Sequence, residues 1–402
     1  MDWREFSFEY HLDGRHLQSL LVEIEASKKA VENLLLPPDW KDQLDRLNRI
    51  RTIRGTTALE GNPLSEAQVR ELLERDTRAD STTKEALQVE NANAAQDWVR
   101  ERFGPGKPPL SVADILHMHR LMTRGSDEVN NVPGRLRAHG VQVGTPALGG
   151  VHLGAPHENL SNLLDGFVAF VNPRRVRDEH PVVRALLAHF FLATIHPFGD
   201  GNGRVSRLVE AAILFEGGYN VHGFYGLSNY FYRNGDLYKR RLQECRREQP
   251  VSVDPFVEFG LQGFDAELKG INSFIKSKLN RLVYRSTLTW ALGERISKRR
   301  RLINEREHGL LVFLLEETEP IDPFSEDPSR RVLLRELVDS PFVRTVYRVV
   351  TPRTFVRELT RLAELGFIVF EQDSVAGESV VGLDFGAIGR YGPTGQLEPH
   401  LR

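Results

Sequence analysis

Apolar residues recur at every third or fourth position through most of the chain, which is the spacing of amphipathic helices. One such segment, residues 15–36, stops at Pro37-Pro38, because proline cannot continue a helix. Another, residues 181–195, is apolar nearly all round, which is typical of a helix at the centre of a bundle. The pattern predicts a mainly α fold, with helices over 15–36, 40–53, 83–103, 111–122, 158–172, 181–195, 206–216, 228–247 and 255–304.

Short strands interrupt this helical pattern at two places. The first is in the middle of the chain, where a turn containing Pro and Gly joins two short apolar segments. The second lies near the C-terminus, around a turn at Ala376-Gly377. Each pair of segments with its turn predicts a β-hairpin. The predicted strands are 141–145 and 151–153 in the first hairpin, and 367–370 and 380–383 in the second.

The sequence changes character from about residue 305. An apolar helix is followed by a loop of Pro, Asp and Ser and by a short helix over 333–338. A longer helix follows over 352–365, with Thr351 as its N-cap, Pro at the first helical position and Gly366 just past its end. Helix, helix and hairpin in this order predict a winged helix-turn-helix-like module over 305–402.

Composition narrows the class of protein. The 402 residues are 40% hydrophobic and 27% charged, as in ordinary globular proteins, and the net charge of −2 favours no acidic partner for the whole chain. A single cysteine, Cys245, excludes an internal disulfide and any cysteine-cluster metal site. The first residues lack an apolar signal core, and no run of about 18 apolar residues is present. We therefore expect a cytoplasmic protein with no membrane partner.

The densest chemistry lies between two predicted helices, in His-Pro-Phe-Gly-Asp-Gly-Asn-Gly-Arg-Val-Ser-Arg at 196–207. Glycines that leave the backbone N–H groups uncovered at a helix start form an anion cradle. Asp200 is an oxygen ligand suited to Mg²⁺, and Arg204 and Arg207 emerge on one helix face, where two guanidinium groups suit a polyphosphate. His196 lies at the rim, where a neutral imidazole can take a proton from a hydroxyl. The sequence lacks a GxxxxGK[ST] loop, which excludes a P-loop NTPase.

This run resembles the motif HxFx[DE]GNGRxxR of the Fic/DOC (Fido) family, and every fixed position matches. The resemblance covers roughly residues 108–263 and, less closely, the N-terminal helices. It implies a Fic-type helical bundle that transfers AMP from ATP to Ser, Thr or Tyr hydroxyls of a protein. The family roles implied for the matching positions are general base for His196, Mg²⁺ ligand for Asp200, ATP and phosphate binding for Gly201, Asn202, Gly203, Arg204 and Arg207, and in particular the α-phosphate for Asn202.

A second short match lies upstream of the motif. Residues 56–62 include Thr56-Thr-Ala-Leu-Glu60-Gly61, which resembles the inhibitory pattern [ST]xxxE[GN] of Fic proteins. The resemblance implies that Glu60 pairs with Arg207 and displaces the γ-phosphate. A carboxylate in the place of an anion competes for its arginine. The next helix is expected to begin at Ser65, with Gln68 completing a capping box.

The hairpin at 141–153 corresponds by resemblance to the Fic flap, which docks a target protein by strand addition. Backbone pairing aligns the hydroxyl without reading much target sequence. The flap residues singled out for docking are Val141, Gln142, Val143 and Gly144. A family stretch that ends in a Tyr pair ends here in Tyr238-Lys239, and aromatic residues at this spacing suit either adenine or the core. The adenine candidates are Tyr230, Tyr232 and Tyr238.

Four parts are expected along the chain. They are an N-terminal helical region at 1–107, a Fic catalytic domain at 108–263, a helical linker at 264–304 and the winged-helix-like domain at 305–402. In the last, Arg353, Arg357 and Arg361 recur every four residues and suit phosphates of DNA, or else form a solvated face. The basic run at 298–301 is likewise expected either to support this domain on DNA or to form a solvated helix end. The inhibitory helix and the C-terminal module also offer surfaces for a homodimer.

The resulting hypothesis is a self-inhibited protein adenylyltransferase, which uses ATP and Mg²⁺ and is able to modify itself. Two alternatives stay open. In one, the same site removes AMP or transfers another nucleotide or phosphate group. In the other, the chain is a DNA-binding regulator in which the Fic domain acts as a sensor.

Overall fold

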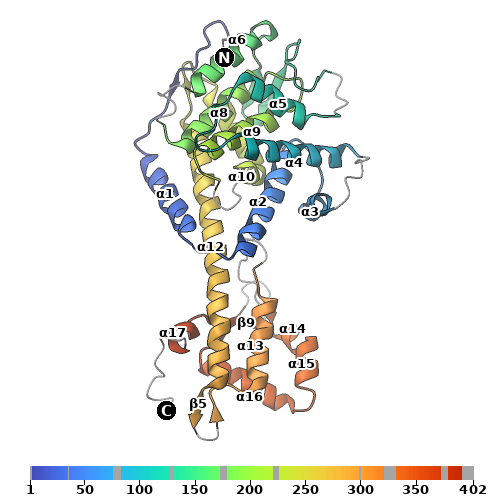
Figure 1. The fold of residues 1–402 in the computed structure, drawn as a ribbon, viewed down its shortest axis with the longest axis vertical. Coiled ribbons are helices and arrows are strands. Elements are labelled where there is room, and N and C mark those ends of the chain that lie inside the picture. The colour runs from blue at the N-terminus through green and yellow to red at the C-terminus, as the bar shows by residue number, and fades with distance from the viewer. Residues whose placement is uncertain are drawn as a thin grey trace. The chain divides into compact units, whose positions relative to one another are not determined.

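The computed structural model describes residues 2–34, 36–75, 83–125, 130–172, 179–220, 226–297, 300–320, 332–372 and 379–391. The chain divides into two compact units, Met1–Lys269 and Gly270–Arg402, and helix α12 (Asp254–Gly293) contributes to both (Figure 1). Most described residues are helical, so the mainly α prediction is confirmed.

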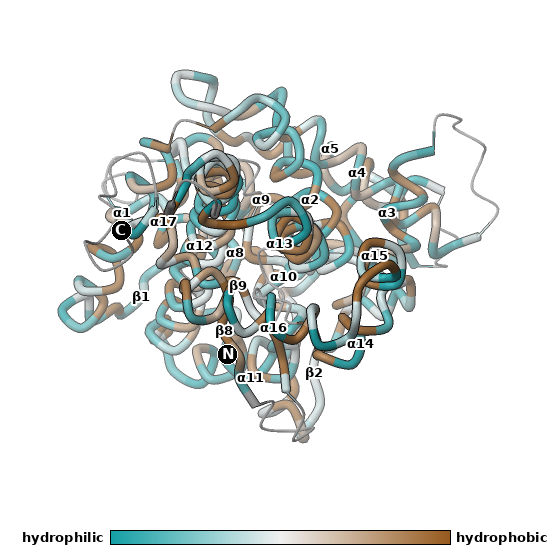
Figure 2. Tube along the Cα trace, turned by 90° about the horizontal axis from the view of Figure 1, so that it is seen from below, coloured by the Kyte–Doolittle hydropathy of each residue, from teal (hydrophilic) through white to brown (hydrophobic). Residues whose placement is uncertain are grey.

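Helices α8 (Pro181–Ile195) and α9 (Asn202–Glu216) lie at the centre of the first unit. Every residue of α8 from Val182 onward is buried, as its apolar sequence predicts. The surrounding helices show alternating apolar and polar stretches in Figure 2. They are α1 (Gln18–Glu32), α2 (Pro38–Ala58), α3 (Glu66–Glu74), α4 (Lys84–Arg102), α5 (Val112–Met122), α6 (Leu160–Val171), α10 (Ser228–Arg233) and α11 (Gly235–Cys245).

Several helix predictions were wrong in their extent. Helix α2 continues to Ala58, past the predicted end at 53, and α9 begins at Asn202, before the predicted start at 206. The stretch 228–247 forms two helices, because the backbone of Asn234 leaves the helical conformation (ψ 37°) while its side-chain amide donates to Tyr230 O at 3.0 Å. Helix α12 ends at Gly293, and β5 (Arg295–Ser297) and β6 (Arg300–Arg301) then form an antiparallel pair. Arg300 and Arg301 are therefore not at a helix end, and residues 298 and 299 lie outside the described part.

Small β elements complete the first unit. Strands β1 (Tyr10–His11) and β4 (Val251–Ser252) pair in parallel. The predicted hairpin is confirmed as β2 (Gln142–Thr145) and β3 (Gly150–Leu153), which pair antiparallel around the 3₁₀ turn η1 (Pro146–Leu148).

The second unit is built on an apolar helix, α13 (Glu305–Glu317), which has the buried residues Leu310, Leu311, Leu314 and Leu315. The second predicted hairpin is confirmed, although its turn at 376–377 lies outside the described residues. A third strand, β7, joins it to give the sheet order β7–β9–β8, and neither β7 nor helix α15 was predicted. The elements after α13 are β7 (Val332–Leu333), α14 (Leu334–Asp339), α15 (Pro341–Val346), α16 (Pro352–Glu364), β8 (Ile368–Gln372), β9 (Ser379–Leu383) and α17 (Ala387–Tyr391).

In the described part of the chain, none of the helices has both the length and the apolar character that crossing a membrane requires.

Candidate functional site

The site is built on the loop that joins the two central helices, α8 and α9. Its first residue, His196, has φ of +55° and is the one non-glycine residue with positive φ among the described residues. Such backbone strain often accompanies function. Gly201 has φ of +79° and is the N-cap of α9. A Cβ at Gly199 would lie 2.0 Å from Asn130 O, so the loop has no space for a side chain there.

Asn202 fixes the shape of this loop. Its Oδ1 accepts a hydrogen bond from the Phe198 N–H at 2.9 Å, and its Nδ2 donates to Phe198 O at 2.8 Å. Both ends of the amide are therefore occupied by backbone. The sequence suggested that Asn202 helps to bind the α-phosphate, whereas here its side chain holds the loop closed.

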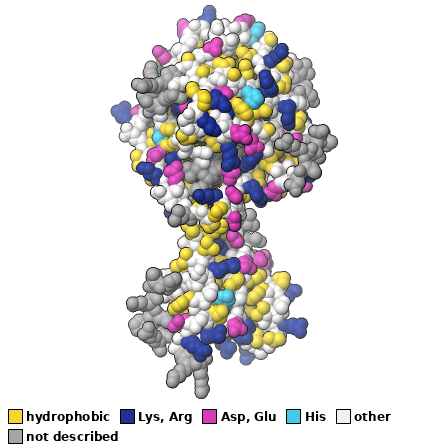
Figure 3. Space-filling view, in the orientation of Figure 1, with side chains coloured by type: hydrophobic (Ala, Val, Ile, Leu, Met, Phe, Trp, Pro, Cys, Tyr) yellow, Lys and Arg dark blue, Asp and Glu magenta, His cyan; other side chains and the backbone are white. Residues whose placement is uncertain are grey.

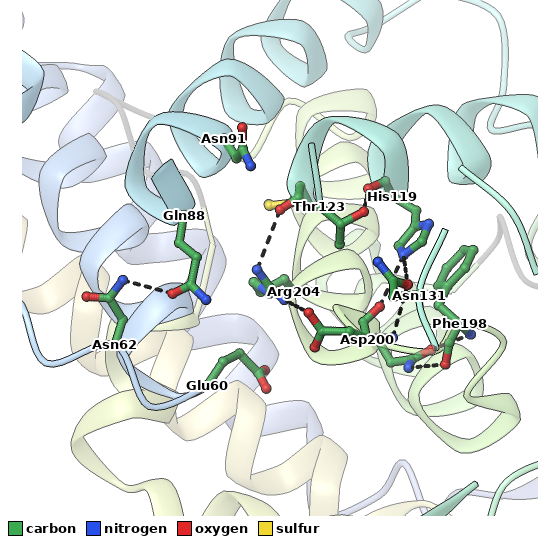
Figure 4. Close-up of polar contacts among 12 residues, drawn as sticks. Glu60, Asn62, Gln88, Asn91, His119, Thr123, Asn131, Phe198, Asp200 and Arg204 are labelled. Carbon is green, nitrogen blue, oxygen red and sulfur yellow. Dashed lines mark hydrogen bonds and ion pairs between the residues drawn. The ribbon is translucent and has the colours of Figure 1, made fainter. Parts of the chain in front are cut away.

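His119 on α5 supports the loop from the other side (Figure 4). Its ring stacks on Phe198 with a centroid distance of 3.8 Å. Because its Nδ1 accepts the Gly134 N–H at 2.9 Å, the proton is assigned to Nε2, which donates to Asp200 O and Asn131 Oδ1, both at 3.1 Å. Burial lowers the pKa of His119 to about 4, so this ring is neutral at pH 7.

His196 is held by its backbone and faces a cavity. The Arg137 Nε donates to His196 O at 2.8 Å, and the other guanidinium nitrogens of Arg137 donate to the carbonyls of His139 and Ala155. Burial is the main reason that the pKa of His196 is lowered to about 4, and the charges of Arg246 and Arg137 lower it further. The ring is therefore neutral at pH 7 and able to accept a proton.

Arg204 and Asp200 form an ion pair one helical turn apart, with Nη2 and Oδ2 separated by 2.6 Å (Figure 4). Arg204 is almost fully buried, while 35% of the Asp200 side chain is exposed. The buried Nε of Arg204 has no hydrogen-bond partner in the described structure. A buried charged group with a spare donor suits an anionic ligand.

Arg207 is engaged by the N-terminal region of the same chain. Its Nη2 lies 2.7 Å from Glu60 Oε1, and its Nε and Nη2 donate to the side chain and backbone oxygens of Thr56 at 2.9 and 3.0 Å. Burial would raise the pKa of Glu60, but Arg207 and Arg204 outweigh this, so the pKa lies below its ordinary value. A Cβ at Gly203 would lie 2.3 Å from Glu60 Oε1, so the carboxylate lies directly against the predicted anion cradle.

A tight turn at the end of α2 presents Glu60. Gly61 has φ of +90°, and the Asn62 N–H donates back to Thr57 O at 3.2 Å. The Asn62 side chain then donates to Glu85 O and Gln88 Oε1 on α4, both at 2.9 Å. The expected capping box follows, with Ser65 and Gln68 bonded reciprocally at the start of α3.

Part of this site lines one cavity of about 300 Å³, whereas Asp200, Asn202 and Arg204 are not among its lining residues. The cavity brings together Glu60, His196, Gly203 and Arg207 with Val143 and Gly144 of the hairpin and Tyr238 of α11. The other two adenine candidates lie elsewhere. Tyr230 packs on Phe259 with a centroid distance of 5.1 Å, and Tyr232 accepts a hydrogen bond from Arg54 at 3.2 Å. The full lining is Leu59, Glu60, Val143, Gly144, Thr145, Leu148, Ala193, His196, Gly203, Arg207, Tyr238, Lys239, Leu242, Gln243 and Arg246.

Comparison with known proteins identifies this architecture. Residues 109–214 match the model of the Fic/DOC family. This part of the chain is a Fic/DOC domain.

The curated relatives are adenylyltransferases by name. The chain is 32% identical over 211 residues to protein adenylyltransferase Fic of Aedes aegypti, covering 52% of this chain and 40% of that protein. It is 28% identical over 217 residues to the Culex quinquefasciatus protein of the same name, covering 54% and 41%. The chain thus spans about two fifths of the length of these relatives.

Two solved structures share the fold. A Fic family protein from Desulfovibrio desulfuricans G20 aligns with a TM-score of 0.56 at 20% identity, over 94% of this chain and 98% of that one. Fic-1 from C. elegans aligns with a TM-score of 0.51 at 25% identity, over 65% of this chain and 73% of that one.

The hairpin of the Fic/DOC domain is held by contacts that the sequence did not suggest. Gln243 Nε2 on α11 donates to Gly150 O at 3.2 Å and to Val143 O at 3.5 Å. Arg246 donates to Gln243 Oε1 at 3.4 Å and to Thr194 Oγ1 at 3.0 Å. His152 on β3 donates to Thr194 O at 2.8 Å. These hydrogen bonds therefore connect the hairpin and α11 to Thr194 at the end of α8, two residues before His196.

His189 is a core histidine whose two ring nitrogens both have partners. It is fully buried, with its ring nitrogens 2.6 Å from Glu210 Oε2 and 2.9 Å from the Tyr238 hydroxyl. The described residues contain no group of three or more His, Cys, Asp or Glu side chains arranged to hold a metal ion.

Proposed function

We propose that this protein transfers AMP from ATP to a hydroxyl group of a protein and that Glu60 restrains this activity. The observation that carries the proposal is that the neutral His196 and the Glu60–Arg207 ion pair line the same cavity in a Fic/DOC domain. The curated names of the relatives support the same chemistry.

The residues suit an in-line transfer. His196 takes the proton of the target hydroxyl, and the oxygen of that hydroxyl attacks the α-phosphorus of ATP. The bond between the α-phosphorus and the oxygen that bridges to the β-phosphate breaks, and pyrophosphate leaves with the electron pair of that bond. Arg204 and Arg207, with the backbone N–H groups at the start of α9, neutralise the phosphate charge. The β2–β3 hairpin would align the target segment by backbone pairing.

Asp200 fits the Mg²⁺ that such a transfer requires. Mg²⁺ commonly binds one or two carboxylates together with substrate phosphates and water, so it needs no cluster of protein ligands. The Asp200 carboxylate is partly exposed beside the cradle, and only its Oδ2 is engaged by Arg204. When bound, the ion would neutralise phosphate charge; Asp200 would hold it and Arg204 would keep Asp200 oriented.

Glu60 would act by occupying the place of an anion. Its carboxylate neutralises Arg207 and lies against Gly203. A phosphate that approached the same arginine would be repelled by this carboxylate and would find the guanidinium already paired. Removing the carboxylate frees Arg207 for ATP. A hydrogen bond between charged groups is worth about 1.5–3 kcal/mol, so the Glu60→Gly protein should label roughly ten- to a hundredfold faster.

Intact-protein mass spectrometry after incubation with Mg²⁺ and ATP tests this function. The Glu60→Gly protein should gain AMP on itself or on an added target, and the wild type should gain much less. The double variant Glu60→Gly/His196→Ala should lose at least about a hundredfold in rate, since it lacks the base. No labelling by Glu60→Gly in any of these mixtures would reject the proposal.

AMP removal by the same site is the alternative that the lining also allows. Incubating an AMP-modified target with the wild type and measuring released AMP separates removal from addition. Transfer of another nucleotide or phosphate group would appear in the mass of the adduct.

The second unit suggests a further role in binding DNA, as a winged helix-turn-helix-like module. Helices α15 and α16 follow each other closely, and the hairpin β8–β9 comes next. Arg353 and Arg357 on α16 are exposed and form no ion pair with any described residue, and basic side chains lie on the face of this unit in Figure 3. Arg361 does not belong to that exposed row, because it pairs with the fully buried Glu307 at 2.6 Å. A homodimer and a cytoplasmic location stay predictions from the sequence.

A further inference from the structure

The cavity beside the hairpin carries an uneven charge. Glu60 is its one acidic lining residue, and it is neutralised by Arg207. His196 is neutral at pH 7, because its pKa is about 4. Two cations remain among the lining residues, Lys239 on α11 and Arg246 directly after the end of that helix. Arg246 is buried and directed at the neutral groups of Thr194 and Gln243, so its charge is not cancelled.

Lys239 is placed next to the strand on which a target would dock. It is exposed, and it shares the cavity wall with Val143, Gly144 and Thr145 of β2. Arg240, the next residue, lies beside the hairpin turn, since a Cβ at Gly149 would be 3.9 Å from the Arg240 Cα. Neither Lys239 nor Arg240 makes an ion pair with a described residue.

The hydrogen bonds of Gln243 fix the position of Lys239 and Arg240 relative to the hairpin. Its amide bridges Val143 O and Gly150 O, one carbonyl on each strand. It lies one helical turn after Lys239 and Arg240 on α11, so the same helix that holds the hairpin also carries the two cations. A peptide strand added to β2 would run about 4.8 Å from it and would advance about 3.3 Å per residue. Side chains within about three residues of the modified hydroxyl are then within reach of Lys239.

We propose that Lys239 and Arg240 select target segments that carry Asp or Glu within about three residues of the modified hydroxyl. This inference rests on the proposed AMP transfer and adds a preference for acidic targets. The phosphate-binding arginines lie on the other helix of the site, α9, so the two cations of α11 serve the target rather than the triphosphate.

The test uses the full chain with Glu60→Gly and short extended peptides. Each peptide has one Ser, Thr or Tyr, and the three flanking positions on either side carry Asp, Asn or Lys in otherwise identical sequences. Incorporation of labelled AMP gives kcat/KM for each peptide. We expect the acidic peptides to exceed the lysine peptides by roughly three- to tenfold, from two partly solvated charge pairs. The order should weaken as salt is raised.

The variant Lys239→Glu/Arg240→Glu in the same background should reverse the order. Lys41→Glu supplies a control for an added negative charge, because Lys41 is exposed near the start of α2, about 22 Å along that helix from Thr56. It should leave the order unchanged.

Three results separate the possibilities. Labelling of all peptides at equal rates, or an acidic preference that persists in the double variant, overturns the inference while the AMP transfer stands. A raised KM for ATP with an unchanged peptide order assigns the cations to the nucleotide, which also overturns it. Absence of any labelling, of peptide or of the chain itself, rejects the proposed function itself.

Discussion

Three histidines around the site have strongly lowered pKa values. Burial lowers the pKa of His119 and of His196 to about 4 and that of His152 to about 3. In the unfolded chain the same side chains titrate near pH 6.5. Each is therefore neutral in the folded state over a range in which the unfolded state binds a proton.

The free energy of unfolding should consequently fall as the pH is lowered below about 6.5. The unfolded state binds more protons there, so stability rises with pH, by up to about 1.4 kcal/mol per pH unit for each histidine. The contribution of these neutral histidines to the free energy of unfolding is fully present above pH 6.5 and is lost as the pH falls towards 4. Urea denaturation at pH 7.0 and 5.5 measures it.

The variant His152→Gln tests the assignment. Glutamine lacks the titration and is able to donate to Thr194 O, so this protein should show a smaller change in stability between the two pH values. An unchanged pH dependence would show that His152 does not contribute. As His196 stays neutral down to about pH 4, its proposed role as a base should set no limit on activity between pH 5.5 and 8.

The local motif of the site was predictable residue by residue, whereas its supports were not. Residues 196–207 are contiguous, so their spacing in the sequence is their spacing in the loop. Arg137, His119 and Gln243 reach the site from separate elements, and a lone Arg, His or Gln has no local signature. Asn202 shows the converse: its position was predicted, but its amide bonds to the backbone of the loop.

At the scale of elements, the position of α2 determines where Glu60 lies. Gly55 packs against α10 so closely that a Cβ would be 2.6 Å from Ser228 O, and this neighbour is backbone. The side chain of Arg54 covers the Tyr232 ring at 4.7 Å and strengthens the same contact. The turn that carries Glu60 begins four residues after Gly55, so a shift of α2 moves Glu60.

Gly55→Ala should therefore both destabilise the protein and raise its AMP transfer. Overpacking of this kind costs about 1–3 kcal/mol, and the melting temperature should fall by a few degrees. Labelling should rise in the same protein, because Glu60 loses its alignment with Arg207. Gly14→Ala is the control, since a Cβ there meets nothing within 4 Å. A melting temperature that falls without any gain in labelling would separate α2 packing from inhibition.

Elements with a strong local pattern were predicted, and those set by their surroundings were not. The hairpin at β2–β3 and the helix α16 have clear signals, namely apolar strands around a Gly-containing turn and proline at the first helical position. Strand β7 has two residues, and it is a strand only because it pairs with β9. The end of α12 at Gly293 was missed because the residues after it, 294–301, are mostly charged and suit a solvated helix end, and β5 and β6 are strands only through their pairing with each other.

For the whole molecule, the two units divide the proposed roles. The cavity and the turn that carries Glu60 belong to the first unit, and the exposed arginines of α16 belong to the second. The domain border expected at 263 falls inside α12, which runs continuously from Asp254 to Gly293, whereas the border expected at 304 falls at Asn304, the N-cap of α13.

If the second unit binds DNA, the full chain should bind duplex DNA with an affinity that falls steeply as salt is raised. Fluorescence anisotropy at several salt concentrations measures this. Arg353→Ala and Arg357→Ala should each reduce the slope of log K against log salt by about 1, because each removes a phosphate contact. Arg285→Ala is the matched control, as Arg285 is exposed on α12 and pairs with Glu316. Binding that is unaffected by salt and by both substitutions would exclude DNA binding through these two arginines.

The ion pair between Glu60 and Arg207 has a consequence for how the protein responds to its surroundings. Both partners belong to one polypeptide, so if Glu60 competes with ATP as proposed, the competitor is present at a local concentration that dilution does not change. The apparent affinity for ATP would then be reduced in proportion to the fraction of molecules in which the carboxylate has left the arginine. The activity per molecule would depend on the nucleotide level and on any contact that moves α2, and not on the concentration of the protein.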